Sequence, residues 1–513
     1  MKRAPSSTFV PPIILDRREN GPIYHQLYNW FRAAITEGRL HPGQPLPSTR
    51  RMAEELQISR ISVFNAYAQL QSEGYLQTAV GSGTCVARAI PDYVLGSSVV
   101  HKGSRTRVGV GAAPRKVSTR VAEISNVPPE PWLLHKPTAF RASLPALDYF
   151  PVNIWSRLVA RHCRGLSRAT MAYGNGMGYL PFREVIAEYL NTSRGVRCDA
   201  SQILVTSGSQ QALQLSAQVL LNPGDRVLVE EPGYPGARVA LLSAGARLIP
   251  QPVDQEGMTP AKLKNDARAP SLAYVTASHQ YPLGMTMNAA RRMSLLNWAA
   301  RSNSWIIEDD YDSEYRFESR PIPSLQGLDI HDRVIYVGTF SKVIFPALRV
   351  GYMVVPKDLV HFFLAARDAA DIFPSTFYQV VLADFISEGH FARHIRRMRM
   401  LYMQRRDALV NALHNYLGGI VQVVGVEAGM HLAILLPVGM NDAAISRIAA
   451  EKDISAMPLS SCYLAPPTRG GLVLGFAGFN NRQIQDGVAK LASIIKEHSS
   501  ACEKRKASLN IAR

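Results

Sequence analysis

The segment TFSKVIFPALRVGY, residues 339–352, places one lysine and one arginine among apolar residues. Lys342 follows a short polar turn after an apolar run, a pattern typical of the end of a buried strand. Arg349 stands seven residues later. A single lysine is usually a surface residue, but a lysine in an apolar pocket has a lowered pKa and can react with an aldehyde. An arginine beside it can bind a phosphate. We therefore ask whether other segments complete such a site.

Two segments upstream supply the missing groups. In WIIEDDYDSEY, residues 305–315, Asp309 follows an apolar strand and precedes Lys342 by thirty-three residues. In TSGSQQAL, residues 206–213, Gly208 permits close approach of a ligand, and Ser209 and Gln210 open a helix whose N-terminus attracts anions. Each segment alone is a weak signal, because strand-end acids and such turns are common. Together the groups match pyridoxal phosphate, whose aldehyde needs a lysine, whose pyridine nitrogen needs a carboxylate, and whose phosphate needs a helix terminus and an arginine.

Residues 141–497 alternate between apolar strand-like runs and helical stretches, which predicts an α/β fold with a large, mostly parallel sheet and helices on both faces. The strand-like runs are ILVTSG, RVLVEEP, LAYVTAS, WIIEDD, VIYVGTF and VGYMVVP. Ligands bind beyond the carboxyl ends of such strands, where the groups above are expected. After about residue 375 long helices predict a smaller C-terminal α+β part.

Residues 12–90 predict a separate small domain of three helices and a hairpin, the arrangement of a winged helix-turn-helix. Its third helix would begin near Ser59 and enter the major groove of DNA. The side chains expected to contact DNA are Ser59, Arg60, Ser62 and Asn65 on this helix, Arg50 and Arg51 on the preceding helix, and Gly83 and Thr84 in the wing. The alternative is a helical interaction domain with a solvated basic face.

The remaining segments and the overall composition give weaker indications of domain organisation and of binding partners. Residues 91–140 are rich in Gly, Ser and basic residues, which predicts a flexible basic linker, and residues 498–513 predict a disordered basic tail. The net charge of +17 favours a polyanionic partner. The five cysteines are scattered and form no pattern typical of a disulfide framework or a metal site. Without an apolar run long enough for a membrane span or a signal peptide, we expect a cytoplasmic protein.

Both parts of the chain resemble known families. The segment PSTRRMAEEL and the segment SRISVFNAYAQLQSEGYLQTAVGSGTCV resemble the GntR-type winged-helix signature, apart from Ile61 where threonine is common. Residues 141–497 resemble a fold-type I aminotransferase through YGNGMGYLPFREVIAEYL, VEEPGYPG, TASHQYPLG, IIEDDYDSEYR and the opening segment. The fusion resembles the MocR/GabR family of transcriptional regulators over almost the whole chain.

The resemblance implies a pyridoxal phosphate site with roles for particular residues. Lys342 would bond to the aldehyde, and Asp309 would pair with the pyridine nitrogen, with Asp310 as the alternative if the register is off by one. Tyr311 would reach the ring hydroxyl, Tyr234 would stack on the ring, and Tyr173 could reach across a homodimer. The phosphate would be held by Gly208, Ser209, Gln210, Ser341 and Arg349.

Two positions depart from the aminotransferase pattern. The turn beside the ring hydroxyl is Tyr281-Pro282-Leu283-Gly284, where aminotransferases place Asn, so His279 or Gln280 is the candidate for that contact. The arginine that grips a substrate carboxylate is replaced by Val473, with Arg469 as a candidate substitute. An uncharged residue cannot bind a carboxylate in a bidentate manner.

These features favour a transcriptional regulator over an enzyme. In this interpretation the N-terminal domain binds a double-stranded DNA operator, and the aminotransferase-like domain senses pyridoxal phosphate or a small amino compound. Ligand binding would shift the protein between two arrangements, and the linker would transmit the change. The alternative is an active aminotransferase that carries a DNA-binding domain.

Overall fold

The computed structural model describes residues 13, 15, 22–79, 83–88, 117–125, 127, 138–259, 269–317, 322–467 and 469–511. The chain divides into two compact units, Met1–Pro114 and Arg115–Arg513, each of which is described by itself. Most of the predicted linker lies outside the described residues. Within the described ranges, no helix is both long enough and apolar enough to cross a membrane.

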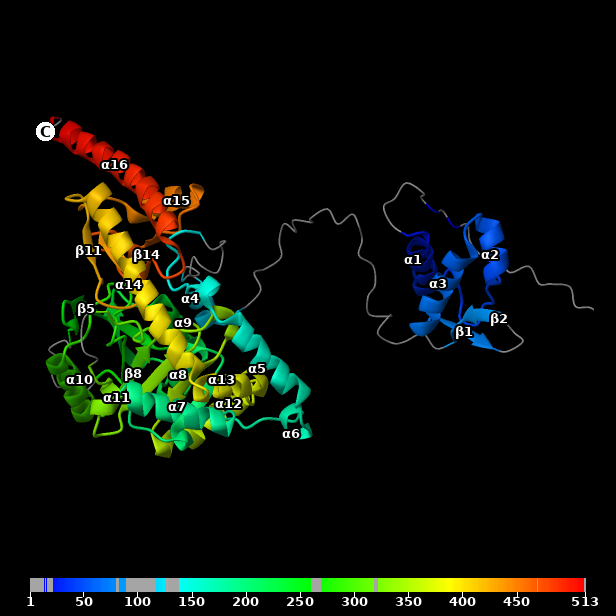
Figure 1. Ribbon diagram of the computed structural model, residues 1–513, viewed down its shortest axis with the longest axis horizontal. Helices are drawn as coiled ribbons and strands as arrows, with labels where there is room; N and C mark the ends of the chain where they lie inside the picture. Colours follow the sequence, from blue (N-terminus) through cyan, green and yellow to red (C-terminus); the bar gives the residue numbers. More distant parts are fainter. Residues whose placement is uncertain are drawn as a thin grey trace, which may run out of the picture. The chain divides into compact units, whose positions relative to one another are not determined.

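The first unit has the predicted three helices and hairpin (Figure 1). They are α1 (Ile23–Thr36), α2 (Thr49–Leu56), α3 (Arg60–Ser72), β1 (Leu76–Ala79) and β2 (Gly83–Val86), with β1 and β2 antiparallel. Ser48 caps α2, since its hydroxyl accepts a hydrogen bond from the backbone N–H of Arg51. Phe31 and Tyr67 meet edge to face in a core that joins α1 to α3. This core fixes the angle at which α3 is presented.

The second unit is built on an eight-stranded sheet with the order β3-β10-β9-β8-β7-β4-β5-β6. The strands are β3 (Ile203–Thr206), β4 (Arg226–Glu231), β5 (Arg247–Asp254), β6 (Gly257–Met258), β7 (Leu272–Val275), β8 (Trp305–Asp310), β9 (Val334–Thr339) and β10 (Gly351–Val354). The central pairs from β5 to β9 are parallel, β10 is antiparallel to both neighbours, and β6 is antiparallel to β5. The prediction of a mostly parallel sheet is confirmed, although β5 and β6 were not foreseen.

Helices cover both faces of this sheet, because successive strand residues point to opposite sides. On β4, Val227 and Val229 pack in one core with α8 (Ser209–Leu220), α9 (Pro235–Ser243) and α12 (Val360–Ala370). Leu228, between them, packs in another core with α10 (Ala289–Ser302) and α11 (Leu325–Leu328). Further helices of this part are α5 (Val152–Arg164), α6 (Arg168–Met171), α7 (Leu180–Ser193) and α13 (Thr376–Ser387).

A smaller C-terminal part follows the long helix α14 (His390–Leu417), as predicted. It holds an antiparallel sheet in the order β11-β12-β14-β13 and two helices. These elements are β11 (Gln422–Val424), β12 (His431–Leu435), α15 (Asp442–Glu451), β13 (Met457–Pro458), β14 (Gly471–Gly475) and α16 (Asn481–Ile511). Helices α14 and α16 pack against each other (Figure 1).

Two segments differ from the expected linker and tail. Helix α4 (Thr119–Ser125) lies within the predicted linker and contacts α9. The predicted tail, 498–513, instead continues α16 as far as Ile511. Both segments lack an obvious apolar periodicity in sequence, which is why helices were not expected there.

Candidate functional sites

A small pocket lies at the carboxyl ends of β7, β8 and β9, where the sequence predicts it. Lys342 follows β9, and Asp309 is the penultimate residue of β8. The structure therefore brings the lysine and the carboxylate together from separate strands. The residues that line the pocket are Ser143, Ser209, Tyr234, Tyr274, Thr276, Tyr281, Asp309, Tyr311 and Lys342.

Asp309 is almost completely buried in this pocket. The hydroxyl of Tyr274 donates a hydrogen bond of 2.8 Å to Oδ2 of Asp309. The other carboxylate oxygen, Oδ1, is buried and has no hydrogen-bond partner in the part of the chain that the structure describes. Burial raises the pKa of Asp309 to about 7, although the Tyr274 hydrogen bond and the charge of Lys342 act in the opposite direction. The site thus holds one acceptor atom ready for a cationic donor.

Asp310, the alternative to Asp309, is engaged elsewhere. Its Oδ2 accepts a hydrogen bond of 2.6 Å from the Tyr336 hydroxyl and lies 3.9 Å from Nε of Arg194. A larger cavity nearby is lined by Arg194 and Glu314 among others, and it contains none of the predicted cofactor residues. The register that places Asp309 in the pocket is the one that the sequence favours.

Gly208, Ser209 and Arg349, which are expected to form an anion cradle, lie beside the pocket at the start of α8. Gly208 caps this helix with a φ of 89°. A Cβ atom at Gly208 would lie 3.0 Å from Nη2 of Arg349, so only glycine lets the arginine come this close. The same Nη2 donates to the carbonyl of Ser207 at 2.9 Å. The hydroxyl of Ser341 is buried and has no hydrogen-bond partner among the described residues.

The remaining predicted contacts divide between those in the pocket and those outside it. Tyr234 and Tyr311 line the pocket, and Tyr234 meets Tyr281 edge to face with a centroid distance of 5.4 Å. The side chain of Gln210 donates to the carbonyl of Gly236 at 2.9 Å and so is turned toward α9. Tyr173 does not line the pocket: it is 86% exposed, with its ring near Phe373.

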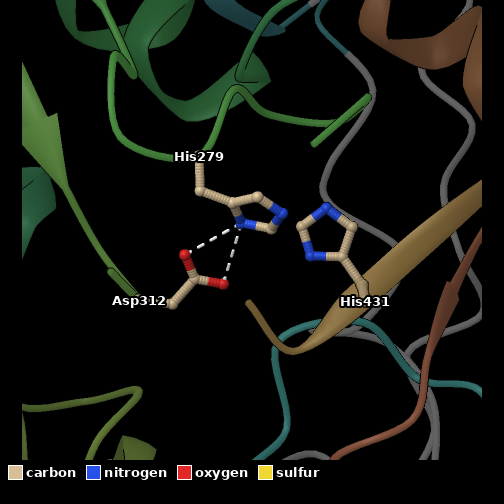
Figure 2. Close-up of side chains that lie close together, drawn as sticks. All are labelled: His279, Asp312 and His431. Atoms are coloured by element: carbon tan, nitrogen blue, oxygen red, sulfur yellow. Dashed lines mark hydrogen bonds and ion pairs between the residues drawn. The ribbon is translucent and has the colours of Figure 1, made fainter. Parts of the chain in front are cut away.

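His279 and Gln280, the candidates for the missing asparagine contact, do not line the pocket either. The Gln280 amide donates to the carbonyls of Pro232 and Tyr281 at 2.8 and 2.6 Å, which holds the turn. Nδ1 of His279 lies 3.0 Å from the hydroxyl oxygen of Tyr311. The same nitrogen is hydrogen-bonded to Asp312, as Figure 2 shows. His279, Asp312 and His431 are all buried, and their ligand-capable atoms lie within 4.8 Å of one another.

The sequence position expected to hold the carboxylate-binding arginine of an aminotransferase is Val473, which carries no charge. Val473 is fully buried in an apolar cluster with Tyr281, against which Tyr234 and Tyr311 also pack. Arg469 is not a substitute, because its guanidinium donates to the carbonyl of Leu436 at 2.7 Å and to Gln422 at 3.0 Å. Val473 therefore adds an apolar layer behind the tyrosines that line the pocket.

The third helix of the first unit presents an exposed face. Arg60 and Asn65 are exposed and Ser62 is half-buried, while the Ser59 hydroxyl caps α3 by accepting from the backbone N–H of Ile61. Arg50 and Arg51 are exposed and pair with glutamates one turn later, at 3.2 and 2.8 Å. In the hairpin, Gly83 is exposed and Thr84 is half-buried.

Several residues at these sites were not indicated by the sequence patterns. Ser143 lines the pocket but stands far from the motifs that predicted it, and Tyr274 lies in the strand-like run LAYVTAS without having been assigned a role. On α3, Ile61 and Phe64 are 69% and 58% exposed, which is unusual for large apolar side chains. The spacing of Phe64 from the buried residues of α3 was the only available signal.

Comparisons with known proteins agree with both units. The family model for aminotransferase class I and II matches residues 148–491, and the model for bacterial regulatory proteins of the gntR family matches residues 23–86. The chain is 40% identical to the Probable rhizopine catabolism regulatory protein MocR of Rhizobium meliloti, over 94% of this chain and 95% of the relative. It is 31% identical to the HTH-type pyridoxine biosynthesis transcriptional regulator PdxR of Corynebacterium glutamicum, over 94% and 98%.

Solved structures resemble the second unit. Kynurenine aminotransferase from Pyrococcus horikoshii superposes with a TM-score of 0.67 and 30% identity, over 75% of this chain and 95% of that one. LysN, an alpha-aminoadipate aminotransferase from Thermus thermophilus, was solved with N-(5'-phosphopyridoxyl)-L-leucine and gives a TM-score of 0.67 and 27% identity, over 75% and 96%. The chain belongs to the MocR-type transcriptional regulators, in which a GntR-family winged helix is joined to an aminotransferase class I and II domain.

Proposed function

We propose that this regulator binds pyridoxal phosphate in its second unit and uses the occupied site to control the affinity of its first unit for operator DNA. The observation that carries the proposal is the pocket, where Lys342 and the unpartnered Oδ1 of Asp309 lie beside an anion cradle. The named relatives of this kind are transcriptional regulators, and the LysN structure holds a phosphopyridoxyl compound. We expect the protein to act in the cytoplasm, where its operator is.

The residues present fit this cofactor. The buried Oδ1 of Asp309 can accept from a protonated pyridine nitrogen, which would restore the ionised carboxylate. The Ser341 hydroxyl, the N-terminus of α8 and the guanidinium of Arg349 offer donors for a phosphate. Tyr234 supplies an aromatic wall and Tyr311 a hydroxyl. When bound, the cofactor supplies an aldehyde that the Lys342 amine can attack.

The protein side of the site can exclude water and hold charges in place. The tyrosines that line the pocket, with Val473 packed behind them, surround the Lys342 amine with apolar ring surface. Asp309 is held by the Tyr274 hydroxyl and cannot turn away. Among the residues that line the pocket, Lys342 is the only basic side chain, and it is assigned to the aldehyde.

We propose a small amine without a carboxylate as the second signal. With Val473 in place of the arginine, a buried substrate carboxylate would lack its charged partner, at a cost of about 2–5 kcal/mol. This is the observation that favours sensing over transamination. The alternative, an active aminotransferase, is supported by the intact lysine, carboxylate and cradle and by the similarity to solved aminotransferases.

We expect a homodimer in which Tyr173 contributes to the partner's site, since its exposed side chain does not line its own pocket. On the DNA, α3 would enter the major groove with Arg60 and Asn65 toward base edges, and Ile61 and Phe64 would add apolar contact. Arg50 and Arg51 would exchange their glutamate partners for phosphates.

The test is fluorescence anisotropy of a labelled DNA fragment from upstream of the gene, titrated at fixed salt with cofactor-free and with pyridoxal-phosphate-loaded protein. We expect the two forms to differ in affinity, and Lys342→Ala protein to lose the difference while still binding DNA. Equal affinity of the two wild-type forms would contradict control by the cofactor. The absence of specific DNA binding in either form would favour the aminotransferase.

A further inference from the structure

Behind Tyr311 lies a buried group of polar side chains that the proposed function does not use. His279 follows β7, Asp312 follows β8, and His431 opens β12 of the C-terminal part. Figure 2 shows the carboxylate of Asp312 turned toward one ring nitrogen of His279, with His431 on the other side of that ring. The side chains of His279 and Asp312 are each 1% exposed, and His431 is fully buried. Buried polar groups of this kind carry a large penalty unless they are paired, so their arrangement calls for an explanation.

One ring nitrogen of His279 serves two neighbours. Nδ1 lies 2.9 and 3.1 Å from the two oxygens of Asp312, and 3.0 Å from the hydroxyl oxygen of Tyr311. An ionised carboxylate can only accept hydrogen bonds, and Asp312 also accepts from the backbone N–H of Met430 at 3.2 Å. Nδ1 must therefore carry the hydrogen that it shares with the carboxylate.

This assignment determines what Tyr311 does with its own hydrogen. If Nδ1 of His279 is protonated, it has no lone pair left, so the Tyr311 oxygen can only accept from it. The phenolic O–H of Tyr311 is then left to donate to some other group. Tyr311 lines the pocket with Lys342 and Asp309, so that group is an acceptor inside the pocket.

The surroundings keep the His279 ring in this orientation. A Cβ atom at Gly429 would clash with Cε1 of His279, and a Cβ atom at Gly284 would lie 3.1 Å from its Nε2. Both glycines have positive φ, 82° and 79°, so neither position readily takes another residue. The His431 ring lies 5.0 Å from that of His279 and is almost parallel to the Tyr311 ring, at an angle of 16°. Neighbours on several sides therefore restrict the imidazole.

We propose that Asp312 and His279 are positioning residues that hold Tyr311 as a hydrogen-bond donor to the ring hydroxyl oxygen of the bound cofactor. Asp312 fixes the tautomer of His279, and His279 fixes the direction of the Tyr311 O–H. The inference rests on the proposed function, because the acceptor belongs to pyridoxal phosphate. The competing occupant of the histidine and aspartate side chains is a metal ion, which would take lone pairs where this arrangement has an N–H.

The experiment compares two ligands with full-length, cofactor-free protein: pyridoxal phosphate and its analogue without the ring hydroxyl. Dissociation constants are measured by absorbance and fluorescence titration. Wild-type protein should prefer pyridoxal phosphate, because the Tyr311 donor has no partner in the analogue. In Tyr311→Phe, His279→Phe and Asp312→Asn this preference should fall by about tenfold, the effect of losing one hydrogen bond to a charged group. Affinity for the analogue should change much less.

The ratio of the two affinities separates positioning from general damage, which would weaken both ligands alike. His162→Gln is the matched control, because His162 forms a second histidine–aspartate pair, 2.8 Å from Asp384, between α5 and α13. It should keep the wild-type ratio, and every variant should keep the wild-type circular dichroism spectrum. The inference is overturned if His279→Phe keeps the full preference, or if wild-type protein binds both ligands equally.

Two further results decide between this inference and others. Failure of wild-type protein to bind either ligand would refute the proposed function itself rather than the role of His279. The assignment of an N–H to Nδ1 would be overturned if the purified protein contained one equivalent of tightly bound transition metal, and if a chelator that removed this metal also abolished the preference for pyridoxal phosphate over the analogue. Metal-free protein with the expected ratios would support it.

Discussion

Replacement of Asp309 by asparagine should affect stability and cofactor binding in opposite directions. Burial raises the pKa of this carboxyl from an ordinary value of 3.8 to about 7. In the cofactor-free protein the folded state therefore binds a proton more tightly than the unfolded chain does. Between about pH 4 and pH 7 the stability of the folded protein falls as pH rises. Above pH 7 the buried Asp309 is ionised, and the stability loss from this ionisation no longer increases. A rise of about 3 in this pKa corresponds to a loss of at most about 4 kcal/mol in the free energy of unfolding.

Asparagine has nearly the same shape and no charge, and its carbonyl oxygen can still accept from Tyr274. Asp309→Asn should therefore match wild type near pH 4.5 and be more stable at pH 8, in thermal unfolding followed by circular dichroism on cofactor-free protein. Its affinity for pyridoxal phosphate should fall by at least tenfold, because a neutral amide carries no negative charge to form an ion pair with a protonated ring nitrogen. A stability difference that is the same at both pH values would refute this reasoning.

The neighbouring residue supplies the control. Asp310→Asn changes a carboxylate that lies beside Arg194 and accepts from Tyr336, away from the pocket. It should lower stability, because a buried arginine loses a charged neighbour, and should leave cofactor affinity within about twofold of wild type. If Asp310→Asn rather than Asp309→Asn abolished cofactor binding, the register of the site would be wrong.

Three other predictions concern the two units separately. Gly208→Ala should weaken pyridoxal phosphate binding by at least tenfold in a fluorescence titration, because the φ of 89° is strained for alanine and its Cβ would press on Arg349; unchanged affinity would remove the cradle from the site. Arg60→Ala should weaken operator binding in anisotropy and reduce the preference for operator over random DNA, whereas Arg50→Ala should weaken both alike and lower the salt dependence. Phe31→Ala, in the core of the first unit, should destabilise that unit by about 3–5 kcal/mol and abolish DNA binding without changing the cofactor absorbance of the second.

The sequence predicted the features that depend on residues close together in the chain. The strand-end positions of Lys342 and Asp309, the cap at Ser48 and the three helices of the first unit follow from short-range patterns. The tyrosine wall does not, because Tyr274 and Tyr281 reach the pocket only through the pairing of β7 with β8 and the turn that follows. His279 was singled out for the ring hydroxyl, but its contact with Asp312 depends on two loops that meet only in the fold.

The pocket and its surroundings concentrate acids that a cofactor-free protein tolerates poorly. Glu230 and Asp309 both have pKa values raised to about 7, chiefly by burial, and the charge of Asp309 adds to the rise at Glu230. Lys342 is the only basic residue that lines the pocket among the described residues. The ionised form of Asp309 is unfavourable in the cofactor-free protein, and a ligand with a protonated ring nitrogen would offset this by pairing with Asp309. Because a ligand that binds only the folded state stabilises it in proportion to the logarithm of its concentration, the stability of this unit should follow the supply of pyridoxal phosphate. A sensor of cofactor supply needs this property, and the apolar position of Val473 does not impair it.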